Sequence, residues 1–321
     1  MRLLAMITLL WAMPVYALAA PAETPLQAPG PHGALRGTVL TPENAKGPVI
    51  LIIPGSGPTN RDGNNPLGIR ASSYKLLAEG LAKEGITTVR IDKRGMFGSS
   101  RAGDPNAVTI EAYTHDIRAW VDVIRMKKGV SCVWVMGHSE GGLVALASGR
   151  SVGGICGLIL LAAPGRPAGH VLAEQLRSNP EGGPEIEQAL AVVAALEMGR
   201  HVNPYALNPT VAQMFNPRVQ DFLISMFAID PARLIAEYHG PVLIIQGKRD
   251  IQVSVKDAER LKDADPAAKL LLLPDTNHVL KKVSLPGRAA NQATYANPHL
   301  PLAEGITEGI AAFVTPPAAM N

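Results

Sequence analysis

One serine lies at the junction of a predicted strand and a predicted helix, where its side chain is suited to covalent chemistry. The segment 137–141 reads Gly-His-Ser-Glu-Gly, and it directly follows the apolar run 133–136 and precedes a helical stretch, 140–148. A residue on such a sharp turn has a strained backbone, and glycines two positions before and after it prevent clashes with the strand and the helix. The pattern predicts that Ser139 is a nucleophile, and the alternative is a tight turn without chemistry.

The predicted nucleophile needs a base and an acid, because a serine hydroxyl is weakly nucleophilic at its ordinary pKa. His278 follows the run 269–273, in the last loop at the carboxyl edge of the predicted sheet, and is the best placed histidine. Asp250 follows the preceding apolar run, so the chain order serine, aspartate, histidine predicts that it orients the imidazole. Asp275, three residues before His278, is the competing acid.

Two backbone amides are predicted to form an oxyanion hole. One is the N–H of Glu140, directly after the nucleophile, at the start of a helix. The other is expected from the loop 54–58, Pro-Gly-Ser-Gly-Pro, with the N–H of Ser56 as the best candidate. This loop lacks the Gly-Lys-Ser/Thr ending of a phosphate-binding loop. The segment 60–64 is expected to brace the loop through internal hydrogen bonds.

A further loop, 92–99, follows a predicted strand and contains glycines that suit a tight turn. We expect it to be a structural loop close to the site. The alternative is that Arg94 within it holds a substrate carboxylate.

The elements that must position these residues are short apolar runs alternating with amphipathic stretches, a pattern typical of a parallel sheet flanked by helices. Several runs are apolar without alternation, as expected for strands covered on both faces. The predicted strands are 37–40, 49–53, 87–91, 133–136, 158–162, 242–245 and 269–273, and the predicted helices are 73–83, 110–127, 140–148, 255–262 and 303–313.

The alternation breaks at about 165–240, where the helix-like stretches 185–198 and 212–227 lie among Pro, Gly and Asn. This segment is too long for one crossover. An insertion at the carboxyl ends of parallel strands lies over the usual ligand crevice, so we expect a helical cap that shapes the substrate pocket. The alternative is a solvent-exposed decoration without contact to substrate.

The N-terminus has the features of an export signal. Arg2 precedes an apolar stretch, 3–15, and Ala17-Leu18-Ala19 resembles a cleavage site. We therefore predict a signal peptide at 1–19, a linker at 20–36, a single domain at 37–321, and a periplasmic or secreted location. The alternative is an uncleaved membrane anchor, against which Pro14 argues.

The chain has two cysteines, Cys132 and Cys156, each just before an apolar run. They are expected on neighbouring strands, either as a disulfide in an oxidising compartment or as two buried thiols. Neither has the paired spacing of zinc ligands, and no metal or organic cofactor is predicted. The net charge of +3 comes from scattered residues, which gives no field suited to nucleic acid.

With these residues in place, the chain resembles the α/β-hydrolase superfamily over nearly all its mature length. The segments similar to those of bacterial esterases related to serine aminopeptidase and acyl-transferase-like hydrolases are 54–63, 92–99, 137–142, 247–253 and 277–281. Pro54 replaces the His that commonly precedes the oxyanion glycine. The resemblance implies the α/β-hydrolase fold, with a mostly parallel eight-stranded sheet, and ester or thioester cleavage through an acyl-enzyme.

The expected partner is therefore a small-molecule ester or amide. A serine aminopeptidase or amidase is the alternative enzyme, and a catalytically silent hydrolase-like binding protein is the alternative outside enzymes, because one fold hosts many functions. We expect no stable membrane association after signal cleavage. These motifs do not specify the acyl group, the alcohol or the oligomeric state.

Overall fold

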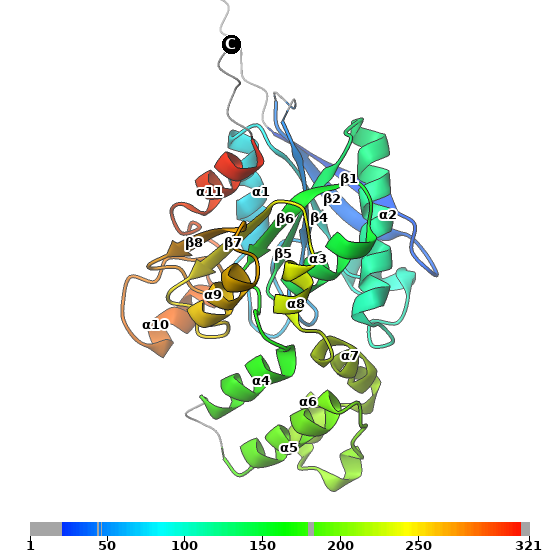
Figure 1. The fold of residues 1–321 in the computed structure, drawn as a ribbon, viewed down its shortest axis with the longest axis vertical. Helices are drawn as coiled ribbons and strands as arrows, with labels where there is room; N and C mark the ends of the chain where they lie inside the picture. Colours follow the sequence, from blue (N-terminus) through cyan, green and yellow to red (C-terminus); the bar gives the residue numbers. More distant parts are fainter. Residues whose placement is uncertain (1–20, 44, 46, 179–182, 316–321) are drawn as a thin grey trace, which may run out of the picture.

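The computed structural model describes residues 21–43, 45, 47–178 and 183–315. Its centre is one eight-stranded sheet with the strand order β1-β2-β4-β3-β5-β6-β7-β8 (Figure 1). Neighbouring strands from β4 to β8 in this order pair in parallel, whereas the β1/β2 and β2/β4 pairs are antiparallel. The strands are β1 (Ala22–Ala28), β2 (Leu35–Thr41), β3 (Val49–Ile53), β4 (Thr87–Ile91), β5 (Val133–His138), β6 (Ile155–Leu161), β7 (Val242–Gly247) and β8 (Lys269–Leu273). The predicted mostly parallel eight-stranded sheet is confirmed.

Helices cover both faces of the sheet (Figure 1). The α-helices are α1 (Ser73–Lys83), α2 (Ile110–Lys128), α3 (Glu140–Ser151), α4 (Ala168–Arg177), α5 (Glu185–Glu197), α6 (Pro209–Met214), α7 (Pro217–Phe227), α8 (Pro231–Ala236), α9 (Val255–Ala264), α10 (Arg288–Ala293) and α11 (Ile306–Val314). Short 3-10 helices are η1 (Phe97–Ala102), η2 (Pro204–Ala206) and η3 (Thr294–Ala296).

The core consists of two layers because successive side chains of a strand point to opposite faces of the sheet. Leu51 of β3 faces the layer that contains Trp120 of α2 and Leu143 of α3. Its neighbour Ile52 faces the layer that contains Leu77 of α1, together with side chains of α11. Strands buried on both faces read as uninterrupted apolar runs, which is why they were recognisable in the sequence.

The prediction that residues 20–36 form a linker is wrong. Residues 22–28 form β1, which pairs antiparallel with β2, and β2 already begins at Leu35. The side chains of β1 are mostly exposed, so it lacks the apolar pattern of a central strand. Pro25 is tolerated in it because β1 is the edge strand. Glu23 of β1 forms an ion pair with Arg90 of β4, which fastens this edge to the sheet.

The predicted insertion at 165–240 is helical. It leaves the carboxyl end of β6, and its helices α4 to α7 form a layer beyond the end of the sheet, at the bottom of the view in Figure 1. These helices share a separate apolar cluster, which includes Leu196, Phe215 and Phe227. The last helix of the segment, α8, instead packs on α3 and α9. The insertion therefore has a small core of its own.

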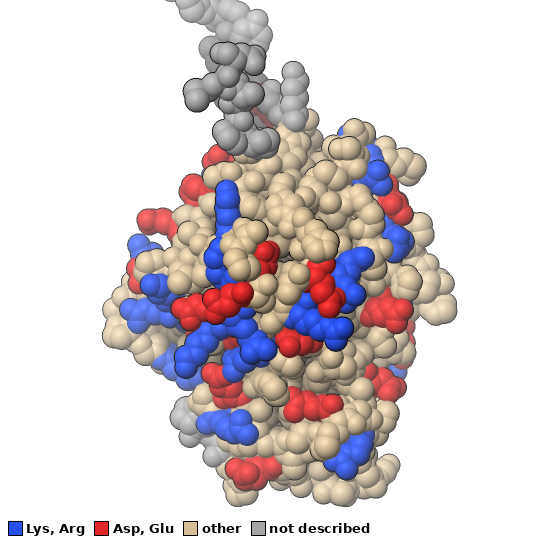
Figure 2. All heavy atoms as spheres, viewed as in Figure 1, with Lys and Arg blue, Asp and Glu red and all other residues tan. Residues whose placement is uncertain are grey.

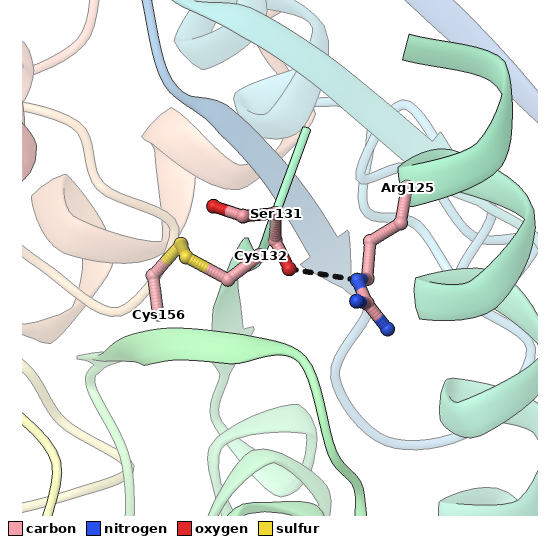
Figure 3. The surroundings of a disulfide bond; sticks show 4 residues. All are labelled: Arg125, Ser131, Cys132 and Cys156. Atoms are coloured by element: carbon pink, nitrogen blue, oxygen red, sulfur yellow. Dashed lines mark hydrogen bonds between the residues drawn. A yellow bond between two sulfur atoms is a disulfide. The ribbon is translucent and has the colours of Figure 1, made fainter. Parts of the chain in front are cut away.

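The two cysteines form a disulfide, which decides between the two expectations for them. Cys132 directly precedes β5 and Cys156 lies near the start of β6, so the bond joins the amino ends of these neighbouring strands. Figure 3 shows the bond beside Arg125 of α2, whose guanidinium donates to the carbonyl of Ser131 (2.8 Å). Ser139 follows the other end of β5, away from the disulfide.

We expect a Cys132→Ser/Cys156→Ser double variant to lose about 3 kcal/mol of unfolding free energy, because the disulfide restricts the unfolded chain. Urea unfolding measures this loss. A reducing agent should bring the wild-type protein to the stability of the double variant and leave the double variant unchanged. Equal stability of the oxidised wild-type protein and the double variant would contradict the prediction.

Figure 2 shows acidic and basic side chains interspersed over the face viewed. Within the part of the chain that the structure describes, no helix is long and apolar enough to cross a membrane. Among the same residues, no group of three or more His, Cys, Asp or Glu side chains is arranged to hold a metal ion.

Candidate active site

Ser139 occupies the turn between β5 and α3 with φ 54° and ψ −123°. A non-glycine residue with positive φ is strained, and such strain persists only where the surroundings hold it. Here the N–H of Ser139 donates to the carbonyl of Leu161 on β6 (2.9 Å), and the N–H of Gly142 donates to the carbonyl of Ser139 (2.9 Å). These bonds fix the serine between two strand ends and the first turn of α3.

The glycines around Ser139 are required by close backbone contacts. A Cβ on Gly137 would lie 2.0 Å from the carbonyl oxygen of Gly141, and a Cβ on Gly141 would lie 2.5 Å from the carbonyl oxygen of Ile53 on β3. The turn of residues 137–142, the elbow, thus packs directly on β3, the strand that leads into the loop 54–58. This contact brings that loop beside the serine.

His278 and Asp250 form a hydrogen-bonded pair at the carboxyl edge of the sheet. Nδ1 of His278 lies 2.8 Å from Oδ2 of Asp250, and their side chains are 6% and 1% exposed. The other carboxylate oxygen accepts the backbone N–H groups of Gln252 (2.8 Å) and Val253 (3.0 Å). Asp275 is exposed to solvent. Asp250 is therefore the acid that contacts the imidazole.

Asp250 is held as a carboxylate. Burial opposes its ionisation, but attraction to His278, the hydrogen bond from His278 and the two backbone hydrogen bonds outweigh burial, so the pKa lies below its ordinary value. A carboxylate only accepts hydrogen bonds, so Nδ1 of His278 carries a proton. In a neutral imidazole, Nε2 then has the free lone pair that can take a proton from a hydroxyl.

Three of the predicted residues line one cavity of about 90 Å³: Ser139, His278 and Ser56. Gly55 and Tyr74 line it as well. A Cβ added to Gly55 would lie 3.4 Å from Cβ of Ser139, so the loop 54–58 passes close over the elbow. Glu140, the other predicted oxyanion residue, begins α3 directly after Ser139. The structure thus brings together the residues expected from sequence.

Sequence reasoning missed a hydrogen-bonded chain behind the cavity. Tyr74 Oη lies 3.0 Å from the N–H of Gly55 and 2.8 Å from Nδ1 of His138. Nε2 of His138 lies 2.8 Å from the carbonyl oxygen of His278. The chain connects the glycine-rich loop, the elbow and the loop that carries the predicted base.

Each proton in this chain can be assigned. A carbonyl oxygen only accepts, so Nε2 of His138 donates to His278. Burial, followed by electrostatic repulsion with the ring of His278, lowers the pKa of His138 to about 3, so the His138 ring is neutral and its Nδ1 accepts the hydroxyl proton of Tyr74. The Tyr74 oxygen in turn accepts the N–H of Gly55. All side-chain polar atoms of His138 and Tyr74 are therefore hydrogen-bonded.

Lys93 is the other residue that sequence reasoning missed. Its ammonium donates to the carbonyl of Gly55 (2.8 Å) and to Oε1 of Glu140 (3.0 Å). The Lys93 and Glu140 side chains are only 4% and 2% exposed. In a trans peptide the C=O and the N–H point in opposite directions. By holding the Gly55 carbonyl, Lys93 therefore fixes the direction of the Ser56 N–H, which belongs to the same peptide unit.

Hydrogen bonds within the protein hold both loops beside the site, and those of 60–64 are internal to the segment, as expected. Asn60 accepts the backbone N–H groups of Asp62 and Asn64 through its side-chain oxygen (both 3.0 Å). Arg94 donates two hydrogen bonds, of 2.6 and 2.7 Å, to the carboxylate of Asp116 on α2. Arg94 is thus occupied by a carboxylate of the protein itself, which disfavours its role as a substrate ligand.

A mostly parallel sheet with a strained serine between strand and helix, and a buried His–Asp pair at the same edge, defines the α/β-hydrolase fold. The chain belongs to the family described as serine aminopeptidase, S33, which it matches over residues 67–280. The expected resemblance to α/β-hydrolases of the esterase and serine aminopeptidase branch is confirmed.

One curated relative is also similar to the chain. Esterase EstD of Thermotoga maritima is 28% identical over 246 residues, which cover 73% of this chain and 54% of EstD. The chain therefore spans about half the length of this curated relative.

Solved structures support the fold alone. Est1E from Butyrivibrio proteoclasticus superposes with a TM-score of 0.53 at 19% identity, covering 85% of this chain and 95% of Est1E. A lipase-esterase related protein from Clostridium acetobutylicum has a TM-score of 0.53 at 16% identity, with coverages of 87% and 99%. Proline iminopeptidase from Mycobacterium smegmatis has a TM-score of 0.53 at 17% identity, with coverages of 80% and 92%.

Proposed function

We propose that the protein is a serine esterase that cleaves carboxylic esters through an acyl-enzyme on Ser139. The observation that carries the proposal is the buried pair of His278 and Asp250 (2.8 Å) at the rim of the cavity that Ser139 lines. The similarity to a protein named esterase also supports it.

In the proposed mechanism, Nε2 of His278 removes the proton from Ser139 as its oxygen attacks the ester carbonyl. The N–H groups of Glu140 and Ser56 stabilise the oxyanion, and Asp250 offsets the charge of the imidazolium. His278 then protonates the leaving alkoxide, and water releases the acid by the same steps in reverse. His278 carries every proton between Ser139, the leaving alcohol and water, and the amides only stabilise the oxyanion, so the mechanism uses no metal or organic cofactor.

The lining of the cavity favours ester over aminopeptidase substrates. Among the described residues, no Asp or Glu side chain lines the cavity of about 90 Å³, and Glu140, which follows Ser139, is already paired with Lys93 (3.0 Å). An aminopeptidase would need a partner for the charged α-amino group of its substrate, because an unpaired charge in a cavity is costly. Thioesters, which the sequence also predicts as substrates, would be cleaved through the same acyl-enzyme.

We expect the purified mature protein to hydrolyse p-nitrophenyl acetate with a kcat/KM about 100-fold or more above that for alanine p-nitroanilide, since the second substrate presents an unpaired ammonium group. Parallel assays with both chromogenic substrates measure this ratio. Efficient anilide cleavage with poor ester cleavage would support the aminopeptidase instead. Failure of a fluorophosphonate probe to label the folded protein would support the catalytically silent binding protein.

We also propose that the protein is exported and is then periplasmic or secreted, with no stable membrane association. The predicted signal peptide at 1–19 lies outside the described residues. The disulfide between Cys132 and Cys156 supports an oxidising compartment, since structural disulfides persist there. N-terminal sequencing of the protein from soluble and membrane fractions tests this proposal.

Removing the Lys93 ammonium should lower the rate of the chemical step more than it weakens substrate binding. Lys93→Met alone would leave Glu140 as an unpaired buried charge, so the informative protein is Lys93→Met/Glu140→Gln, which removes both charges. We expect its kcat to fall about 10- to 100-fold, with a smaller change in KM. This fall in kcat is no larger than the one that follows removal of an oxyanion donor.

The matched control for this prediction is Glu140→Gln, which keeps the ammonium on the Gly55 carbonyl. We expect a smaller loss of kcat in this variant. Urea unfolding of both variants separates a loss of stability from a loss of rate. If the double variant and Glu140→Gln have the same kcat, Lys93 does not position the Ser56 amide.

A further inference from the structure

A larger, second cavity lies beside the glycine-rich loop and the start of α3. It has a volume of about 460 Å³ and is lined by Gly57, Pro58 and Glu140, the neighbours in sequence of the residues around the smaller cavity. Its outer wall includes Val219 and Phe222 of α7, so the helical insertion contributes to it. Ser139 itself lines the smaller cavity, and the larger one reaches Glu140, the next residue in the chain.

The lining of the second cavity is mostly apolar, with Asn106, Lys93 and Glu140 as its polar side chains. Met96, Val108 and the aromatic ring of Tyr113 line it together with the α7 side chains, and Tyr113 and Phe222 contact each other edge to face with ring centroids 6.0 Å apart. Lys93 and Glu140 also line it, but they neutralise each other at 3.0 Å. An apolar group is the ligand that such a lining binds best, because binding removes its surface from water.

The surroundings of the smaller cavity are more polar than those of the apolar cavity. That cavity shares Ile69 and Gln252 with a third cavity, of about 330 Å³, which leads toward α10. Gln175 of α4, Arg288 and Gln292 line this third cavity. Amide and guanidinium groups donate hydrogen bonds, so this side suits hydroxyl-bearing or otherwise polar groups.

The position of His278 decides which part of an ester faces which cavity. The leaving alkoxide takes its proton from His278, so the alcohol must lie on the side that His278 lines. His278 lines the smaller cavity, whereas it is not among the described residues that line the apolar cavity. The acyl group, on the far side of the tetrahedral carbon, then faces the apolar cavity.

We infer that the cavity of Val219 and Phe222 is the acyl pocket, and that the substrates are esters of an apolar acyl group with a smaller or more polar alcohol. This inference rests on the proposed esterase function. It assigns selectivity for the acyl group to α7, and it places the alcohol on the side of the smaller cavity.

Two isomeric esters test the assignment directly: ethyl hexanoate places its longer chain on the acyl side, and hexyl acetate places it on the alcohol side. We expect the wild-type protein to hydrolyse ethyl hexanoate with a kcat/KM at least about tenfold higher than that for hexyl acetate. One methylene in an apolar pocket already contributes about this factor. Titration of the released acid measures both rates. Equal rates, or a preference for hexyl acetate, would overturn the inference.

A variant that fills the pocket gives an independent test. Val219 is half-buried on α7, and Val219→Trp should lower the ratio of kcat/KM for ethyl hexanoate to that for ethyl acetate by about tenfold or more. The matched control is Ile229→Trp, since Ile229 is also half-buried but lines a separate cavity with Ile110 and Leu234. The control should keep the wild-type ratio. The ratio is independent of the fraction of folded protein.

The outcomes separate this inference from the proposed function. Hydrolysis of all three esters without acyl-side preference, or an unchanged ratio in Val219→Trp, would overturn the acyl pocket and leave the esterase standing. Failure of the wild-type protein to hydrolyse any of these esters or to react with a fluorophosphonate would reject the esterase, and the inference with it.

Discussion

Ser139→Ala should lower kcat for short-chain p-nitrophenyl esters by about 10⁵-fold or more, the scale of loss seen when a triad nucleophile is removed. The variant keeps the cavity, the amides and the His278–Asp250 pair, but no oxygen remains to form the acyl-enzyme. Stopped assays with high enzyme concentration measure the residual rate. Intact-mass spectrometry should find a fluorophosphonate adduct on the wild-type protein and none on the variant.

The matched control is Ser56→Ala, a second serine of the same cavity. It loses a hydroxyl but keeps the backbone N–H that is proposed to bind the oxyanion, so the loss should be less than about tenfold, well short of that for a missing oxyanion donor. Rates near the wild-type value in Ser139→Ala would reject Ser139 as the nucleophile. A large loss in Ser56→Ala alone would give the Ser56 hydroxyl a role that we do not assign to it.

Asp250→Asn should lower kcat by about 10⁴-fold, as expected when the acid of a triad becomes an amide. The amide has an N–H group that can face Nδ1 of His278, which then accepts. The ring proton moves to Nε2, and no lone pair remains to deprotonate Ser139. Because Asp250 is buried and also accepts the amides of Gln252 and Val253, the variant needs a stability measurement beside the rate.

Asp275→Asn is the control, because this aspartate lies in the same loop as His278 but is exposed. We expect its rates to stay within a few-fold of the wild type. A larger loss in Asp275→Asn than in Asp250→Asn would show that the acid of the active enzyme differs from the partner seen in the structure.

The central strands could be predicted from sequence because their physical signals are local. Runs such as 49–53 and 242–245 are apolar throughout, since both faces of these strands are covered. The edge strand β1 has no such signal. Its side chains are mostly exposed and it contains a proline, so its pairing with β2 depends on hydrogen bonds that no apolar pattern reports.

The residues of the candidate site also divide into those that the sequence predicts and those that it does not. Ser139, Asp250 and His278 each follow a recognisable strand, so their meeting at one edge of the sheet could be expected from the chain order. Lys93 could not be recognised in this way, because a lysine beside glycines in a loop is typical of a solvated surface. Its burial arises from contacts with Gly55 and Glu140, residues 38 and 47 positions away.

The separate apolar cluster of α4 to α7 has a consequence for how this protein could diverge. A subdomain that is stabilised by its own side chains can change residues such as Val219 without disturbing the packing of the sheet. The catalytic residues and the α7 side chains that line the proposed acyl pocket would then evolve at different rates. Exchanging α4 to α7 for the corresponding helices of a relative should transfer chain-length preference while the bond-breaking machinery stays intact.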